Sequence, residues 1–318
     1  MSVANNDNLQ PWERTALQQL LTETLKEQKR ARRWKIFFRT LYLIIFIFII
    51  LLLIPDNATT YASGKSHTAL VIMKGELMDG GDANAADVNE GLDAAFKDPD
   101  TKAVLLEINS PGGSPVQAGE IYQNIIRLEN AHPKIKVYAV CTDVCASGAY
   151  YVAAAANYIY ADKASLVGSI GVLMDGFGFV DTLNKVGVER RLMTSGSEKG
   201  FLDPFSPVKP QDQALMQNML DIIHTQFIQA VKDGRGTRLQ SDPLLFSGLV
   251  WTGQQAQPLG LIDGIATPDE VVRQIIKIPN TQDFTVTDTF YEKFANRLGS
   301  SFARNIGTVL GIQTSGLR

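Results

Sequence analysis

The chain has 318 residues, 45% of them hydrophobic, and a net charge of -3 at pH 7. This length is enough for a membrane segment and one globular domain of about 200 residues. The charge gives no indication of a nucleic-acid partner, and the two cysteines, Cys141 and Cys145, are too few for a disulfide scaffold. We expect two reduced structural thiols there, because a metal site would need more ligands than this stretch offers.

A long apolar run near the N-terminus predicts one transmembrane helix. The run Leu41–Ile54 has no polar break, and extending it back to Ile36 gives about 19 residues, or roughly 28 Å of helix, close to the thickness of a hydrocarbon core. Basic residues far outnumber the single acid, Glu27, around its start, which places residues 1–35 in the cytoplasm and everything after Pro55 outside it. These basic residues are Lys26, Lys29, Arg30, Arg32, Arg33, Lys35 and Arg39.

A cleaved signal peptide is the alternative for this segment, because small residues follow the apolar run in "NATTYAS". The leading segment is far longer than a usual signal-peptide n-region, so an uncleaved anchor over residues 36–54 is favoured. Within that leading segment, the helical spacing of Leu17, Leu20, Leu21 and Leu25 predicts a short amphipathic helix.

The region after a polar linker at 55–67 alternates between strand-like and helix-like patterns. Helical periodicity covers residues 85–98 and 116–131, and this alternation predicts an α/β domain over 68–282 with much parallel pairing. Functional sites in such domains lie in loops at the carboxyl ends of the strands. The expected strands are Thr68–Met73, Ala103–Ile108, Lys136–Cys141 and Ser165–Leu173.

Two of these loops carry candidate catalytic groups. The loop "NSPGGSP" offers the backbone N–H groups of Gly112 and Gly113 to an oxyanion, although Pro-Gly-Gly is also an ordinary turn. Ser147 stands at the apparent N-terminus of a helix, "SGAYYVAAAA", where unpaired N–H groups and the helix dipole favour a developing negative charge. Serine is also a common N-cap, so a purely structural role is equally consistent with this position.

None of the three histidines is an evident base for taking the Ser147 proton. His67 lies in the linker, His132 in a turn and His224 in a long helix, so no histidine is well placed to form a Ser-His-Asp triad.

A lysine can replace histidine as the base only if its amine is desolvated and neutral. Lys163 and Lys185 look like solvated surface charges, and Lys209 begins the long helix. Lys199 lies in a glycine-flanked loop just before several apolar residues, but spacing alone does not single it out.

Several motifs in one order resemble the bacterial signal peptide peptidase A family, in its half-length form. These are "NSPGGS", "CASGAYYVAAAANYIYA", "VGSIGV", "SGSEKG" and "SGLVWTGQQAQPLGLIDG". The resemblance covers most of residues 68–277 and implies a ClpP/crotonase-like α/β fold with a Ser-Lys dyad. It implies Ser147 as nucleophile, Lys199 as base, Ser169 as the residue that orients this lysine, and Gly112 and Gly113 as oxyanion donors.

One residue departs from the family pattern. Glu198 stands before Lys199 where many members have an aromatic residue. A nearby carboxylate would favour the charged form of the amine, so either Glu198 faces solvent or the assignment of Lys199 is weakened.

The resemblance also implies an activity and a location. We expect a serine endopeptidase on the bacterial inner membrane, with its catalytic domain outside the cytoplasm, that degrades signal peptides left after secretion and needs no metal or cofactor. The expected partners are peptide substrates, the lipid membrane and further copies of the chain. A stripe in the C-terminal extension, 283–318, fits self-association, packing on its own domain or shallow membrane contact. The stripe consists of Phe290, Phe294, Leu298, Phe302, Ile306 and Leu310.

Two other functions remain open at this point. A crotonase-like acyl-CoA enzyme would use the same kind of oxyanion hole with carboxylates such as Glu107 and Glu120. An inactive scaffold of the same fold would use Ser147 only to cap its helix.

Overall fold

The computed structural model describes residues 10–53 and 65–286. The chain divides into two compact units, one formed by residues 1–61 and 288–318 and the other by residues 62–287. The predicted stripe in the C-terminal extension therefore lies outside the described residues.

Helix α1 (Pro11–Leu53) is the described part of the first unit and runs for 43 residues without a break. Pro11 occupies the first helical position, where its missing N–H costs nothing, and neither proline nor glycine occurs after it in the helix. The predicted amphipathic and apolar segments thus form one continuous helix.

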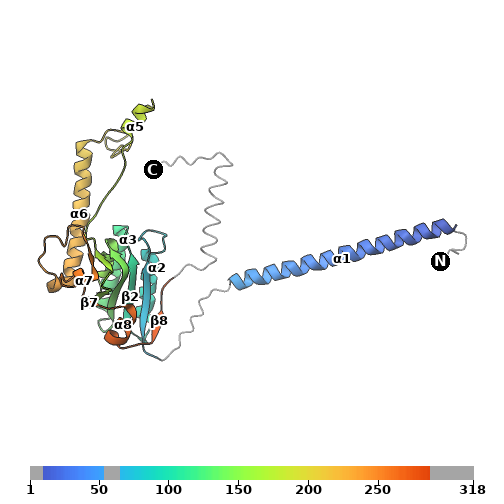
Figure 1. Ribbon diagram of the computed structural model, residues 1–318, viewed down its shortest axis with the longest axis horizontal. Coiled ribbons are helices and arrows are strands. Elements are labelled where there is room, and N and C mark those ends of the chain that lie inside the picture. Colours follow the sequence, from blue (N-terminus) through green and yellow to red (C-terminus); the bar gives the residue numbers. More distant parts are fainter. Residues whose placement is uncertain (1–9, 54–64, 287–318) are drawn as a thin grey trace. The chain divides into compact units, whose positions relative to one another are not determined.

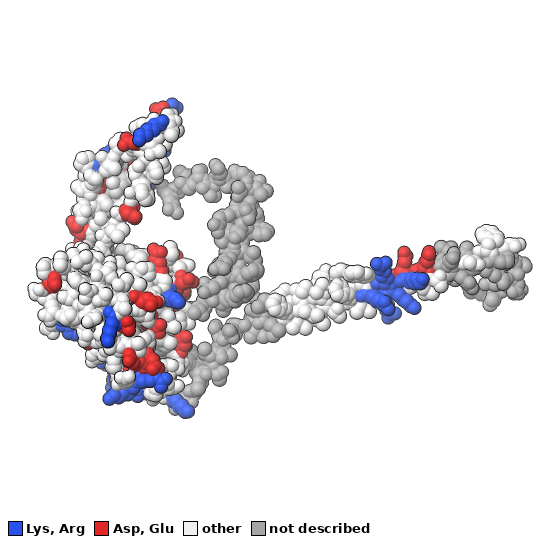
Figure 2. Space-filling view, viewed as in Figure 1, with Lys and Arg blue, Asp and Glu red and all other residues white. Residues whose placement is uncertain are grey.

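In α1, a cluster of basic residues is followed directly by a stretch without charged residues. Figure 2 shows a cluster of Lys and Arg side chains on α1 beside a stretch without charged side chains. Side chains from Leu41 to Ile50 in this stretch are apolar and exposed. Over residues 10–53 and 65–286, no helix offers an apolar segment of the length that crossing a membrane takes. The predicted span ends at residue 54, just past the described part of α1.

The second unit is an α/β domain built on one mostly parallel sheet, as predicted. The sheet has eight strands, of which six follow the order β6-β5-β3-β2-β1-β8, and β4 joins β3 to β7. Among the strand pairs of residues 65–286, only β5–β6 is antiparallel. The strands are β1 (His67–Lys74), β2 (Thr101–Ser110), β3 (Lys136–Ala146), β4 (Tyr158–Ala161), β5 (Leu166–Gly168), β6 (Val250–Thr252), β7 (Gly264–Ile265) and β8 (Thr281–Asp283).

Helices α2 (Ala85–Lys97) and α3 (Pro115–Ala131) bury apolar faces in the main core of this domain. Each begins at a side-chain cap, since Asn84 accepts the N–H of Asp87 and Ser114 accepts that of Gln117. Leu92 and Ile121 are fully buried, and each such side chain contributes about 1.5 to 3 kcal/mol. The core holds the ends of β2 and β3 in place, and the catalytic candidates follow these strands.

The remaining helices and helical turns all follow β3 in the chain. They are α4 (Gly148–Ala153), α5 (Val180–Lys185), α6 (Pro210–Arg235), α7 (Gly253–Ala256), α8 (Pro268–Glu270), the 3-10 turn η2 (Gly236–Arg238) and the π-helical turn η3 (Val271–Ile276).

Helix α6 is fixed to the core at its C-terminal half. The Phe227 ring lies 5.0 Å from the Tyr151 ring, and the Tyr122 hydroxyl donates to the Ala230 carbonyl. At the end of α6, the buried Arg235 guanidinium donates to both carboxylate oxygens of Asp263, at 2.8 and 3.0 Å. Burial opposes the charge of Asp263, but the hydrogen bonds from Arg235 and from the Ile159 N–H lower its pKa overall.

Residues 171–209, which we call the arm, leave the sheet after β5 and lead to the start of α6. Figure 1 shows α5 beyond the end of α6 that lies far from the sheet. Many apolar side chains of the arm are uncovered: Leu173, Phe177 and Met193 are 81%, 79% and 92% exposed. The arm therefore lacks the apolar covering that a folded monomer normally gives such residues.

The observed elements differ from the predicted ones at several places, and β6, β7 and β8 were not predicted. His67 is the buried first residue of β1, and its Nε2 lies 3.1 Å from the Thr101 hydroxyl. Strand β4 was not predicted, because the alanine run before it suggested a longer helix than α4. The predicted strand at 165–173 ends at Gly168, because Ser169 has a φ of 52° and turns the chain.

Candidate active site

Ser147 occupies a sharp turn between β3 and α4. Its φ is 54° and its ψ is -127°, a conformation that costs a non-glycine residue about 1 to 3 kcal/mol. Two hydrogen bonds hold it there, from the Ser147 N–H to the Gly168 carbonyl at 2.8 Å and from the Tyr151 N–H to the Ser147 carbonyl at 3.0 Å. Although Ser147 is the N-cap residue of α4, its side chain makes no capping hydrogen bond.

The glycine loop after β2 packs directly against this turn. Leu77 clamps the loop, because its N–H donates to the Gly112 carbonyl at 2.8 Å and its carbonyl accepts the Ser114 N–H at 2.7 Å. Gly112 and Gly113 have φ values of 96° and 142°. A Cβ on Gly112 would lie 2.6 Å from the Gly148 nitrogen, so only glycine allows this approach.

The two loop glycines occupy different environments. The Gly112 N–H donates to the Ser110 hydroxyl at 3.1 Å, and Gly112 is not among the residues that line the pocket containing Ser147. Gly113 and Gly148 both line that pocket. Gly148 is the first residue of α4, so its N–H has no acceptor within the helix. The geometry thus offers the N–H groups of Gly113 and Gly148 to a ligand, with Gly112 providing the close contact behind them.

Sequence analysis did not consider Gly148 as a candidate donor, although a signal was available. In strained strand-to-helix turns that carry a nucleophile, the N–H of the next residue commonly contributes to the oxyanion hole. The adjacency of Gly148 to Ser147 could therefore have indicated it.

Ser147 and Ser169 line one pocket of about 670 Å³. Ser169 is held by donation of its N–H to the Leu249 carbonyl at 2.8 Å. Tyr151 also lines the pocket, and burial raises the pKa of its phenol. Most other lining residues are apolar or small: Pro111, Pro115, Ala118, Gly171, Val172, Leu173, Ile223, Phe227 and Gly248, with the polar Glu76, Gln226 and Ser247.

Two of the predicted site residues, Gly112 and Lys199, do not line this pocket, and Lys199 lies in the arm. It is exposed, it lies in a run of tight turns in the arm, and its N–H donates to the Gly196 carbonyl at 3.2 Å. It is not among the lining residues. Glu198 beside it is also exposed, and within the described residues no ion pair joins the two.

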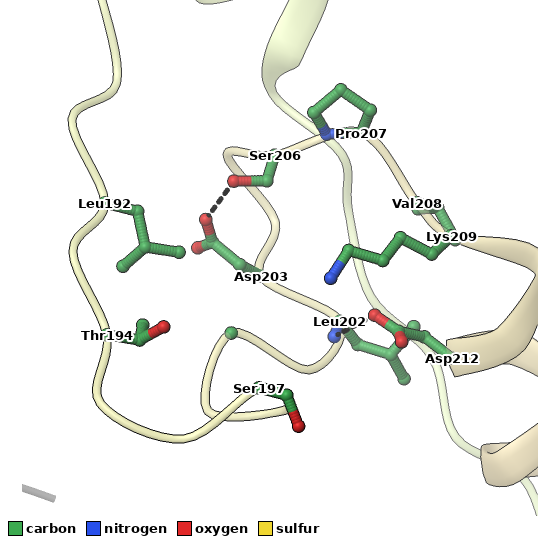
Figure 3. Close-up of a pocket in the computed structure, with 11 residues that line it drawn as sticks. Leu192, Thr194, Ser197, Leu202, Asp203, Ser206, Pro207, Val208, Lys209 and Asp212 are labelled. Carbon is green, nitrogen blue, oxygen red and sulfur yellow. Dashed lines mark hydrogen bonds between the residues drawn. The ribbon is translucent and has the colours of Figure 1, made fainter.

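The loop that carries Lys199 is tied to the start of α6 around a second, smaller pocket. Figure 3 shows the Asp203 carboxylate accepting from the Ser206 hydroxyl, with Lys209 and Asp212 on the other side of the pocket. The buried Asp212 carboxylate accepts the Leu202 N–H at 3.4 Å. These contacts give the Lys199 loop a defined shape within the arm.

No histidine lines the Ser147 pocket. His132 contacts the Phe96 ring, and His224 on α6 lies 3.1 Å from the Ile170 carbonyl through its Nε2. Glu107 and Glu120 do not line the pocket either. Cys141 and Cys145 are buried free thiols, and burial raises the pKa of Cys145.

A strained serine between a parallel strand and a short helix, with backbone N–H groups beside it, is the arrangement that hydrolases with an acyl-enzyme intermediate use. Residues 129–280 match peptidase family S49. This match, together with relatives named SppA and Protease 4, supports the signal peptide peptidase A family of serine peptidases.

Several curated proteins are similar to this chain. A Brucella abortus protein named Na(+)/H(+) antiporter NhaA is 44% identical over 215 residues, which cover 66% of this chain and 29% of that protein. The putative protease MJ0651 of Methanocaldococcus jannaschii is 29% identical over 70% of both chains. A putative signal peptide peptidase SppA of Enterococcus faecium is 28% identical over 66% of this chain and 60% of its own. The chain thus spans less than a third of the Brucella protein.

Proposed function

We propose that this protein is a serine endopeptidase in which Ser147 is the nucleophile. The observation that carries the proposal is the state of the Ser147 hydroxyl, which sits at a helix N-terminus without capping it, in a strained turn and facing a pocket. A serine that served only as a cap would accept, through its side-chain oxygen, a hydrogen bond from an N–H of the first turn. This geometry disfavours the inactive-scaffold alternative.

The proposed reaction has two halves. Neutral Lys199 takes the Ser147 proton as the serine oxygen attacks the peptide carbonyl, and the N–H groups of Gly113 and Gly148 stabilise the oxyanion. The protonated lysine then gives the proton to the leaving amine. Water, activated by the same lysine, hydrolyses the acyl-enzyme and regenerates Ser147. Ser169, in the same pocket wall, orients the amine of Lys199.

The acyl-CoA alternative is disfavoured by the position of the acids. Glu107 lies within β2, and burial raises its pKa although Lys74 opposes the shift. Neither Glu107 nor Glu120 lines the Ser147 pocket, so neither is within reach of a thioester held there. The ClpP/crotonase-like assignment is therefore proposed for the fold and not for the acyl-CoA chemistry.

The lysine base is supplied by a neighbouring copy of the chain in this proposal. Within one chain Ser147 and Ser169 share a pocket, whereas Lys199 is exposed on the arm. The arm also presents uncovered apolar side chains, and a neighbouring copy would bury them. A homo-oligomer thus explains both the missing base and the exposed apolar surface.

Mixing two inactive variants tests the shared site. Chains with Ser147→Ala and chains with Lys199→Ala, carrying different tags, are co-assembled and purified through both tags. Mixed oligomers are expected to recover a substantial fraction of wild-type peptide hydrolysis, because some sites then contain both residues. Mixed oligomers without activity would contradict the shared site, as would a fully active monomer.

Membrane attachment through α1 is a further part of the proposal. The apolar, exposed stretch of α1 follows a basic cluster, which favours an inner-membrane anchor with a cytoplasmic N-terminus and an extracytoplasmic catalytic domain. The chain is expected to stay with membranes through a high-pH wash, and Phe46→Lys with Ile49→Lys should release it. The matched change Val188→Lys in the arm should not. Release of the unaltered chain by the wash would contradict the anchor.

An enzyme at this location would meet signal peptides left after secretion, and these are short apolar segments. The largely apolar pocket around Ser147 suits such substrates. We therefore propose signal-peptide remnants and other small membrane-associated peptides as the substrate class.

A further inference from the structure

We propose that Glu76 makes this enzyme select peptides that carry a positive charge next to an apolar segment. The inference extends the function proposed above. Of the described residues that line the Ser147 pocket, Glu76 alone is charged. A single carboxylate in an otherwise neutral wall gives the pocket one electrostatic preference, and that preference is for a cation.

The backbone fixes Glu76 close to the reacting groups. On one side, the Gly75 N–H donates to the Asn109 carbonyl at 3.0 Å. On the other, Leu77 clamps the glycine loop, and a Cβ on Gly113 would lie only 2.2 Å from the Leu77 carbonyl oxygen. Glu76 therefore directly precedes Leu77, whose backbone hydrogen-bonds to the residues on both sides of Gly113.

A carboxylate at this place would destabilise the oxyanion unless a positive charge lies beside the carboxylate. The oxyanion that forms beside Gly113 would be repelled by a nearby negative charge. No lysine or arginine of the described chain forms an ion pair with Glu76. A cation on the substrate would pair with Glu76 on binding and so remove this penalty before the oxyanion forms.

The other residues that line the pocket indicate which kind of substrate segment lies next to the positive charge. Val172, Leu173 and Ile223 offer an apolar surface, and Phe227 adds an aromatic one. An apolar peptide segment flanked by lysine or arginine matches this combination. Signal peptides have this chemistry, because their basic n-region precedes an apolar h-region.

Paired peptides test the inference. In each pair, one lysine beside an apolar segment is replaced by norleucine, which keeps the carbon stem and removes the charge, and the lysine is stepped through the positions on both sides of the cleavage point. At the best position, wild type is expected to favour the lysine peptide about 5- to 30-fold in kcat/KM. Glu76→Gln should bring that ratio close to one, chiefly by raising kcat/KM on the norleucine peptides, because it removes the unpaired negative charge near the oxyanion. Glu76→Lys should invert it.

A matched control separates local charge from net charge. Asp79 is an exposed acid three positions along the chain that does not line the pocket, so Asp79→Asn should keep the wild-type ratio. A ratio near one in wild type at every position, or the wild-type ratio in Glu76→Gln, would overturn the inference. An equal loss on both peptides in Glu76→Gln, with a shifted pH–rate profile, would overturn it in favour of a contact between Glu76 and the lysine base.

Binding separates this inference from the proposed catalysis. In the Ser147→Ala background, the dissociation constants of the same paired peptides are measured with and without Glu76→Gln. A lysine preference that depends on Glu76 supports the inference even if the wild-type chain proves unable to hydrolyse peptides. Binding without any lysine preference overturns it even if hydrolysis is efficient.

Discussion

Ser147→Ala and Lys199→Ala are each expected to reduce peptide hydrolysis by on the order of 10⁴-fold or more. The two side chains act as one unit, because the serine attacks only as the lysine removes its proton. The double variant should therefore be about as inactive as either single variant. The measurement is kcat/KM on an apolar fluorogenic peptide, made on protein whose fold is verified by thermal unfolding.

Two lysines provide the control for Lys199. Lys163 and Lys185 are exposed and do not line the Ser147 pocket, so their replacement by alanine should leave hydrolysis within about twofold of wild type. Lys199→Ala with activity within tenfold of wild type would remove Lys199 from the mechanism, whatever Ser147→Ala does.

Gly113→Ala is expected to lower kcat by at least about 100-fold. A Cβ at this position would lie 2.2 Å from the Leu77 carbonyl oxygen, and the φ of 142° is one that alanine rarely adopts. The loop would have to shift, and its N–H would leave the position that stabilises the oxyanion, a contribution of roughly 2.7 to 4 kcal/mol for one donor. KM should change much less than kcat, because this interaction forms in the transition state.

Gly119→Ala on α3 is the matched control, because a Cβ there meets nothing within 4 Å. It should leave kcat unchanged and should stabilise the helix by up to about 1 kcal/mol. A Gly113→Ala enzyme with wild-type kcat would show that the glycine loop contributes no donor to the reaction.

The parts of the fold that sequence predicted are those with strong local signals. Strands β1, β2 and β3 are apolar runs, and α2 and α3 have clear helical periodicity with polar caps. Strand β4 and the short edge strands were missed, because their pairing depends on neighbours far along the chain. The hydrogen bond from the Ile159 N–H to Asp263 is an example, since no local pattern near β4 indicates it.

The parts of the site that short sequence motifs define were predictable. Ser147 and the glycine loop stand out because each is a small-residue turn after an apolar strand. The different environments of Gly112 and Gly113 were not predictable, since they depend on how Ser110 and Leu77 meet the loop. Sequence spacing also could not place Lys199 relative to Ser147, because Lys199 lies in the exposed arm and does not line the pocket of its own chain.

Labelling with a fluorophosphonate probe, which reacts with activated serines, tests most directly the claim that Ser147 is a nucleophile. Peptide mapping by mass spectrometry of the labelled full-length protein is expected to find the adduct on Ser147 alone. Ser147→Ala should abolish labelling and Lys199→Ala should slow it strongly. Ser247→Ala, which changes another serine of the same pocket, should not affect it. An adduct on a different serine, or no adduct on an assembled and peptide-hydrolysing protein, would contradict the account.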